Sequence, residues 1–201
     1  SRLVAARKTL LNQLRALLLE RGHIFPQGRR KLEQALDVLI DDPAFAVSPR
    51  MRELVSDMRA EWQGLDRRIA ALNGEVVELA RSDAAARRLI TIPGVGVLNA
   101  TALVAAVGDA GAFRRGRDLA AWLGLVPKQQ TTGGKPKLLG ISKRGNKYLR
   151  MLFIHGARAA MPTLAKSATP LGTWLRGLLA RTHRNIAIVA LANKLARIAW
   201  A

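Results

Sequence analysis

Three hydroxyl groups in the basic second half of the chain have the chemistry of a nucleophile. Thr131 and Thr132 stand directly before Gly133-Gly134-Lys135, and Tyr148 is the only tyrosine of the 201 residues. Each hydroxyl could attack a phosphodiester if a base or a cluster of cations activated it. The alternatives are a tyrosine ring that packs on its helix and threonines that are ordinary polar residues of a loop. The residues themselves therefore offer candidates for phosphoryl transfer without choosing among them.

Other catalytic chemistries lack their residues in this chain. There is no cysteine, and His23, His155 and His183 lie far apart without an acid or thiol at metal-ligand spacing. The basic half holds one carboxylate, Asp118, whereas a two-metal nuclease site needs several acidic oxygens. Gly133-Gly134-Lys135 has neither the spacing nor the preceding strand of a nucleotide-binding P-loop. We expect no metal site and no cofactor in this chain.

Charge is the strongest global feature of the sequence. The formal net charge is +19. Residues 1–110 hold 16 Lys and Arg against 13 Asp and Glu, a net +3, whereas residues 111–201 hold 17 against 1, a net +16. Such an asymmetry is typical of proteins that neutralise phosphates. An anionic membrane surface is the competing explanation, but the cations stand among glycines and in loops and not along one amphipathic face. We therefore expect nucleic acid as the partner, and no membrane.

The cations expected to contact nucleic acid gather between residues 128 and 150. Four of them surround the start of a helix predicted from about Ser142, where the helix dipole disfavours positive charge. A bound polyanion would offset that cost. The full set is Lys128, Lys135, Lys137, Lys143, Arg144, Lys147 and Arg150.

A second phosphate-binding device is predicted at Ile92–Gly96, with the sequence Ile-Pro-Gly-Val-Gly. Gly94 and Gly96 permit a tight turn between two apolar helices, and Val95 can anchor that turn from inside. The free N–H groups at the start of the second helix would then face outward and bind backbone phosphates, as in a helix-hairpin-helix. A plain turn inside a helical core is an equally good interpretation of these five residues.

The elements that must position these groups are helical. The apolar spacing predicts a fold that is mostly all-α, in which an extended helical or coiled-coil arm precedes a compact helical domain. We place the arm at 1–83 and the domain at 84–201. Residues 126–137 are expected to be a loop, because two prolines and two adjacent glycines interrupt any periodicity, and no strand is indicated anywhere. Helices are expected at 2–21 (ending at Gly22), 29–40 (ending near Asp41-Asp42-Pro43), from Ser48-Pro49 onward, 84–90, 98–107, 118–125, from about 142, 171–180 and 185–200.

A heptad seam runs through the long central helix of the arm. Its apolar residues follow steps of four and three, which is typical of a coiled coil or of a helical hairpin within one chain. The two alternatives, a dimer or tetramer interface and a seam packed inside the same chain, stay open. The seam consists of Met58, Trp62, Leu65, Ile69, Leu72, Val76 and Leu79.

The sequence contains no signal peptide and no apolar span of membrane length, which indicates a cytoplasmic protein. It starts at Ser1 without a methionine. That start suggests a fragment of a longer chain.

An ordered series of motifs gives the chain a family resemblance over residues 89–201. Together they resemble the C-terminal domain of DEDD-type insertion-sequence transposases of the IS110 and IS1111 group, closer to IS1111. Residues 1–88 are similar to the coiled-coil linker of that family. The motifs are Ile-Pro-Gly-Val-Gly (92–96), Gly-Asp (108–109), Phe113, Leu-Ala-Ala-Trp-Leu-Gly-Leu-Val-Pro (119–127), Thr-Gly-Gly-Lys (132–135), Gly-Ile-Ser-Lys-Arg-Gly-Asn-Lys-Tyr-Leu-Arg (140–150) and His-Gly-Ala-Arg (155–158).

The resemblance implies a recombinase guided by a structured RNA. It implies a separate RuvC-like domain whose four acidic residues bind magnesium, and a serine nucleophile in the loop before Gly-Gly-Lys. The matching position is Thr132, or Thr131 if the register differs by one, and neither is a serine.

The hypothesis is that the chain is a piece of a DNA transposase. This piece would bind DNA and a guide RNA, with Thr132 or Thr131 as the nucleophile. Magnesium and its carboxylates would come from the RuvC-like domain, so the chain alone would bind nucleic acid without cutting it. The alternative is a non-catalytic nucleic-acid-binding and oligomerisation module with inert threonines. A helical scaffold without nucleic-acid affinity is a third.

Overall fold

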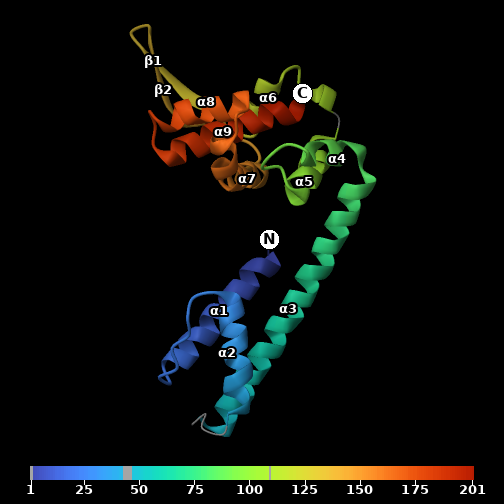
Figure 1. Ribbon diagram of the computed structural model, residues 1–201, viewed down its shortest axis with the longest axis vertical. Coiled ribbons are helices and arrows are strands. Elements are labelled where there is room, and N and C mark those ends of the chain that lie inside the picture. The colour runs from blue at the N-terminus through green and yellow to red at the C-terminus, as the bar shows by residue number, and fades with distance from the viewer. Residues whose placement is uncertain (1, 43–46, 109) are drawn as a thin grey trace. The chain divides into compact units, whose positions relative to one another are not determined.

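The chain folds mostly into α-helices, which confirms the predicted fold class. The computed structural model describes residues 2–42, 47–108 and 110–201, and the chain forms two compact units, Ser1–Glu75 and Val76–Ala201 (Figure 1). The helices are α1 (Arg2–Leu19), α2 (Arg29–Asp41), α3 (Pro49–Ser82), α4 (Ala84–Ile90), α5 (Val97–Val107), η1 (Ala110–Ala112), α6 (Gly116–Trp122), α7 (Lys147–Lys166), α8 (Pro170–Leu179) and α9 (Arg184–Trp200). In the ranges that the structure describes, none of them has the length and apolar character needed to cross a membrane.

The first unit packs α1 and α2 against the first part of α3. Leu14 of α1, Leu32 and Leu36 of α2 and Trp62 of α3 are almost completely buried in one apolar cluster. Each buried leucine side chain of this kind contributes roughly 1.5–3 kcal/mol to folding. The arm is therefore a small helical bundle with a core of its own.

Two of the predicted signals of the arm helices, the stop at Gly22 and the start at Ser48-Pro49, are confirmed. The backbone leaves α1 through Gly22, which has a φ of 81° that glycine adopts without a Cβ clash. At the start of α3, the Ser48 hydroxyl accepts a hydrogen bond from the Met51 N–H at 3.3 Å, directly before Pro49. The predicted stop at Pro43 lies outside the described residues.

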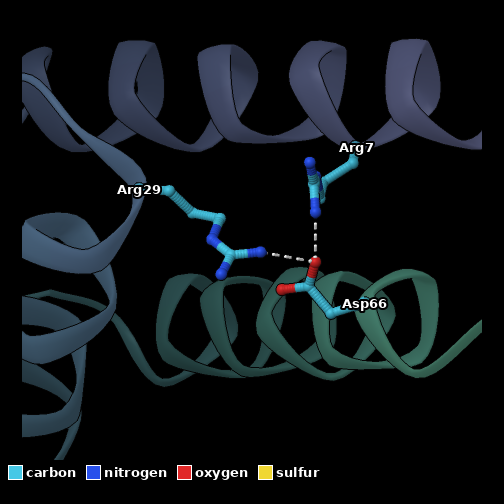
Figure 2. Close-up of polar contacts among 3 residues, drawn as sticks. All are labelled: Arg7, Arg29 and Asp66. Atoms are coloured by element: carbon cyan, nitrogen blue, oxygen red, sulfur yellow. Dashed lines mark hydrogen bonds and ion pairs between the residues drawn. The ribbon is translucent and has the colours of Figure 1, made fainter. Parts of the chain in front are cut away.

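Asp66 of α3 joins all three helices of the first unit. Its Oδ1 accepts hydrogen bonds from Arg7 of α1 at 2.6 Å and from Arg29 of α2 at 2.9 Å (Figure 2). A further ion pair links Arg59 of α3 to Asp37 of α2. Several arginines of the arm are thus paired with carboxylates of the same unit.

The heptad seam of α3 changes character along the helix. Trp62 and Leu65 are buried against α1 and α2, so this part of the seam packs within the chain. Further along, Leu72 and Leu79 expose 49% and 60% of their surface. The sequence left two alternatives open, and the structure assigns the first part of the seam to intrachain packing.

The second unit is built around α7 and α9, which contact each other and also receive α5, α6 and α8 (Figure 1). Phe153 and Ala157 of α7 and Leu191 and Leu195 of α9 are fully buried in its core. The side chain of Asn146 caps α7 by accepting the Leu149 N–H at 3.0 Å. Consequently α7 begins at Lys147 and not near Ser142, where the sequence placed it.

The prediction of a loop at residues 126–137, with no strand in the chain, is wrong. Pro127–Thr132 forms β1 and Lys135–Ile141 forms β2, an antiparallel hairpin that extends from the helices of the second unit (Figure 1). The strands escape a hydrophobic-pattern analysis because almost every residue in them is exposed, so no apolar alternation marks a buried face.

Candidate nucleic-acid interface

The hairpin separates the two candidate threonines onto opposite faces. Thr132 pairs with Lys135, and Gln130 pairs with Lys137. Directly opposed residues of an antiparallel ladder share a face, and residues two apart along a strand share it too. Thr132 therefore lies on one face with Lys135, Gln130 and Lys137.

Thr131 belongs to the other face of the hairpin. It is opposed by Pro136, and Gln129 on the same face is opposed by Leu138. The Gln129 Nε2 donates a hydrogen bond to the Thr131 Oγ1 at 3.3 Å, which is consistent with this shared face. Both threonines are exposed, but only the face of Thr132 carries the β2 lysines, Lys135 and Lys137.

The turn that fixes this register consists of Gly133 and Gly134. Their φ angles are 57° and 75°, so both central residues lie in the left-handed region. A two-residue hairpin turn with two positive φ angles strongly favours glycine. Gly-Gly between two segments is itself a hairpin signal, and it is the one feature from which the strands could have been predicted.

The basic segment Ser142–Asn146 is tied to the foot of the hairpin. The Ser142 N–H donates to the Val126 carbonyl at 2.8 Å, and the Lys143 N–H donates to the Gly124 carbonyl at 3.1 Å. Lys143 has a φ of 56°, which is uncommon for a residue with a Cβ. The side chains of Lys143, Arg144 and Lys147 are exposed there. The structure thus places the backbone of Lys143 at the foot of the hairpin, whereas Lys135 and Lys137 lie nearer its turn.

Arg150 is the exception among the predicted phosphate contacts. Its side chain is 9% exposed, and its Nη1 donates to the carbonyls of Leu123 at 3.0 Å and of Arg144 at 3.1 Å. The Nη1 group therefore satisfies two backbone acceptors inside the fold, and a phosphate contact by Arg150 stays a prediction. Arg150 is a structural residue that holds the basic segment against the end of α6.

Gly94 and Gly96 have different surroundings in the turn between α4 and α5. Val95 between them is buried in the core, as expected for an anchor. Gly94 has a φ of 88°, and a Cβ there would lie 2.8 Å from the Gly156 carbonyl oxygen of α7. The close approach that this glycine permits is therefore an approach to α7. Gly96 is exposed, it precedes the first turn of α5, and its Cβ position meets nothing within 4 Å. Phosphate binding at this turn stays a prediction.

The described residues offer no group of three or more His, Asp and Glu side chains that could hold a metal ion. In the second unit, Glu78 pairs with Arg81 at 2.7 Å, Asp83 accepts the Ala86 N–H at 2.7 Å, and Asp118 accepts the Arg115 N–H at 3.1 Å. Each of these carboxylates already pairs with a residue of its own helix or caps the helix that follows it. These residues do not fit a magnesium site.

Tyr148 and His183 lie at the starts of two different helices of the second unit. Tyr148 is 42% exposed in the first turn of α7, and both alternatives for its hydroxyl stay open. His183 precedes α9, where its Nδ1 accepts the Asn185 N–H at 3.2 Å.

Comparisons with known proteins point to one family. The family model described as "Transposase IS116/IS110/IS902 family" matches residues 86–169. The chain is 47% identical over 203 residues to a "Probable family 20 transposase" of Pseudomonas aeruginosa, covering all of this chain and 60% of that protein. It is 40% identical to the "Transposase for insertion sequence element IS1111A" of Coxiella burnetii (all of this chain, 55% of that protein). It is 38% identical to the "Transposase for insertion sequence element IS1328" of Yersinia enterocolitica (98% of this chain, 58% of that protein). The chain thus spans somewhat more than half the length of each of these relatives.

Proposed function

The chain belongs to the transposase family of the insertion elements IS116, IS110 and IS902, and from this premise we propose that it binds DNA and supplies the nucleophile for strand exchange. The lysines of the hairpin, together with Lys143, Arg144 and Lys147, would hold backbone phosphates. Binding of this kind is electrostatic and independent of sequence. A guide RNA, which the family resemblance implies, presents the same phosphate chemistry to the same cations.

The observation that carries the proposal is the shared face of Thr132, Lys135 and Lys137. A phosphate held by two lysines beside a hydroxyl is both positioned for attack and stabilised as charge develops on its oxygens. Thr131 faces Pro136 and Leu138 instead and has no cation directly opposite or diagonal on its own face. We therefore propose Thr132, and not Thr131, as the nucleophile.

The proposed step is a transesterification. The Thr132 oxygen forms a bond to phosphorus, the bond from phosphorus to one deoxyribose oxygen breaks, and that oxygen leaves as a hydroxyl after taking up a proton. Residues 119–154 contain no Asp, Glu or His that could accept the threonine proton. We propose that the base comes from another part of the enzyme, for which the RuvC-like domain implied by the resemblance is the candidate. That domain would also supply the magnesium ligands that the described residues lack.

The arm would join protomers through the exposed part of its seam. Leu72 and Leu79 lie on α3 at heptad spacing and expose about half of their surface or more. Large apolar side chains in such a row are typical of an interface. A dimer or tetramer would bring two or more basic units to the paired DNA ends that a recombinase must handle together.

The experiment that tests the nucleophile traps a covalent adduct on a nicked suicide DNA substrate, using the chain joined to its RuvC-like domain. We expect Thr132→Ala to abolish the adduct and Thr131→Ala to preserve it. Thr132→Ser should preserve or increase it, because a primary hydroxyl is less hindered. Loss of the adduct in Tyr148→Phe, with both threonine variants active, would show that Thr132 is not the nucleophile.

A non-catalytic nucleic-acid-binding and assembly module is the second candidate. It is favoured by the absence of Asp, Glu and His from residues 119–154. In that case the adduct would not form with any variant, although binding to DNA would persist. Absence of both binding and adduct would leave a helical scaffold, which a filter-binding assay detects at once.

A further inference from the structure

A large groove opens at the foot of the hairpin, within the second unit. Its volume is about 1040 Å³, and it lies between the start of α6, the hairpin residues nearest the core, Trp174 of α8 and one side of α9. Ligand sites for small molecules usually occupy about 300–1,000 Å³. The groove is therefore large enough for more than one nucleotide.

Of the residues that the structure describes, five cationic side chains and no Asp or Glu line this groove. They come from three separate segments of the chain: Arg115, Arg117, Lys143, Lys194 and Arg197. Among the residues that the structure describes, none of the five forms an ion pair, whereas in the arm Arg7 and Arg29 share Asp66 and Arg59 pairs with Asp37. Unpaired like charges around one concavity repel each other, and an anionic occupant would relieve that repulsion.

The groove also exposes apolar and aromatic surface. Its lining includes Ile186 and Leu139, which are 58% and 41% exposed, and the ring of Trp174. The Lys194 Nζ lies 4.3 Å from the centroid of the Trp174 ring, a cation–π contact in which the ammonium covers one face of the ring. A base that stacks on that face takes the place of the ammonium. An occupant must therefore combine flat apolar groups with negative charge, which is the combination that a nucleotide offers.

An unpaired strand fits these features better than a duplex. In a duplex the faces of the bases are stacked on each other, whereas an unpaired base can stack on an aromatic side chain while its phosphates contact Lys and Arg. Asn185 and Asn193 in the lining supply amide groups for base edges. Asn193 uses its Nδ2 to bind the Leu125 carbonyl at 3.1 Å, which leaves its oxygen as an acceptor.

One cation of the groove is fixed by the backbone. Lys143 has its positive φ of 56° at the point where its N–H binds the Gly124 carbonyl at 3.1 Å. Such uncommon backbone conformations cost free energy and persist only where the surroundings hold them. The backbone of Lys143 is therefore held at the junction of the groove and the hairpin, and its exposed side chain starts from that point.

We propose that this groove binds an unpaired segment of the DNA strand that continues from the phosphate held near Thr132, with one base stacked on Trp174. Hairpin residues at the foot form one wall of the groove, and a strand that follows β1 from Thr132 reaches them after roughly 16 Å, a few nucleotides. This inference rests on the proposed DNA-binding function and adds a site for single-stranded DNA to it.

The test measures binding of the 201-residue chain to three labelled DNA probes by fluorescence anisotropy. The probes are a single strand of about 12 nucleotides, long enough for one binding site, the same strand with abasic sites throughout, and the duplex. We expect the single strand to bind at least about fivefold more tightly than its abasic counterpart, because stacking of one base contributes about 1–3 kcal/mol. Trp174→Ala should remove that preference while duplex binding persists, and Trp174→Phe should retain most of it.

A second variant guards against loss of folding in Trp174→Ala. Ile186→Glu changes a side chain that is 58% exposed, so it should fold normally and place a negative charge in the groove. We expect its affinity for the single strand to fall about tenfold, with a smaller effect on the duplex. The hairpin variant Lys135→Ala/Lys137→Ala should weaken binding of all three probes and leave the preference for bases unchanged.

The outcomes separate the two proposals. Equal affinity of the wild-type chain for the single strand and its abasic counterpart would overturn the groove proposal while leaving duplex binding, and hence the proposed function, in place. Unchanged single-strand binding in both Trp174→Ala and Ile186→Glu would overturn it as well. Tighter binding of RNA of the same sequence, or binding of anionic vesicles in place of DNA, would assign the groove to another occupant. Failure of all DNA probes to bind would remove the proposed function itself.

Discussion

Thr132 and Lys135 face each other across the Gly133-Gly134 turn, as the pair of opposed residues next to the tip of the hairpin. The pairing puts a hydroxyl and an ammonium group on one exposed face. It also places Lys137 diagonally on that face, one pair further from the turn. A phosphate at this face would contact two cations, whereas the opposite face offers none.

The hairpin cations are expected to set the salt dependence of DNA binding. Each phosphate that the protein no longer neutralises should reduce the slope of log K against log salt by about 0.9, so Lys135→Ala/Lys137→Ala should make the slope shallower by about 1.8. Filter binding at several salt concentrations measures it. The matched control is Lys8→Ala/Lys31→Ala, which removes two exposed lysines of the arm. Equal slopes in both double variants would argue against the hairpin as a phosphate site.

Gly134→Ala should loosen the hairpin without unfolding the chain. Its φ of 75° is unfavourable for a residue with a Cβ, at a cost of roughly 1–2 kcal/mol. We expect lower DNA affinity and weaker cross-strand NMR contacts, with the thermal unfolding midpoint of the core unchanged because the strands are exposed. Gly140→Ala is the control, because Gly140 has no positive φ and its Cβ would meet nothing within 4 Å. A similar loss in both variants would contradict the assignment to the turn.

Arg150→Ala should destabilise the second unit. It removes the donor to the Leu123 and Arg144 carbonyls, and leaving buried acceptors unsatisfied costs about 1–3 kcal/mol. Urea unfolding measures this change. The control Lys147→Ala alters an exposed cation one turn earlier and should lower DNA affinity with little effect on stability. The reverse pattern, a stable Arg150→Ala that binds DNA weakly, would restore Arg150 as a phosphate contact.

The two glycines of the turn between α4 and α5 should respond differently to alanine. Gly94→Ala would put a Cβ 2.8 Å from the Gly156 oxygen at a φ of 88°, so we expect a loss of at least about 2 kcal/mol in unfolding free energy. Gly96→Ala meets open space at a φ of −84° and should remain stable. DNA titrations of Gly96→Ala then test phosphate binding at this turn separately from folding. Normal stability of Gly94→Ala would contradict the packing role.

The exposed part of the α3 seam predicts association between protomers. Leu72→Asn/Leu79→Asn should raise the dissociation constant of the oligomer by about a hundredfold or more, since burial of a leucine contributes about 1.5–3 kcal/mol. Light scattering coupled to size exclusion measures the mass at several concentrations. Val38→Asn, an exposed apolar residue of α2, is the control. A wild-type chain that is monomeric at every concentration would rule out this interface.

The sequence by itself determined the helical fold class, the position of most helices, the concentration of charge in the second half and the family. These features depend on local signals, such as the cap at Ser48 and the stop at Gly22, or on sums over many residues. They do not require knowledge of which distant segments meet. The resemblance likewise rests on motifs that are contiguous in the chain.

Only the tertiary structure decided which candidate residues lie together. The hairpin has no buried face, so hydrophobic periodicity could not reveal it, and the sequence could not tell the face of Thr132 from that of Thr131. Arg150 looked like its basic neighbours until the Leu123 carbonyl, 27 positions away, was seen to accept its hydrogen bond. Gly94 meets Gly156 in the same way. The physical reason is common to all three cases, because the role of each residue is set by contacts with chain segments that sequence proximity does not predict.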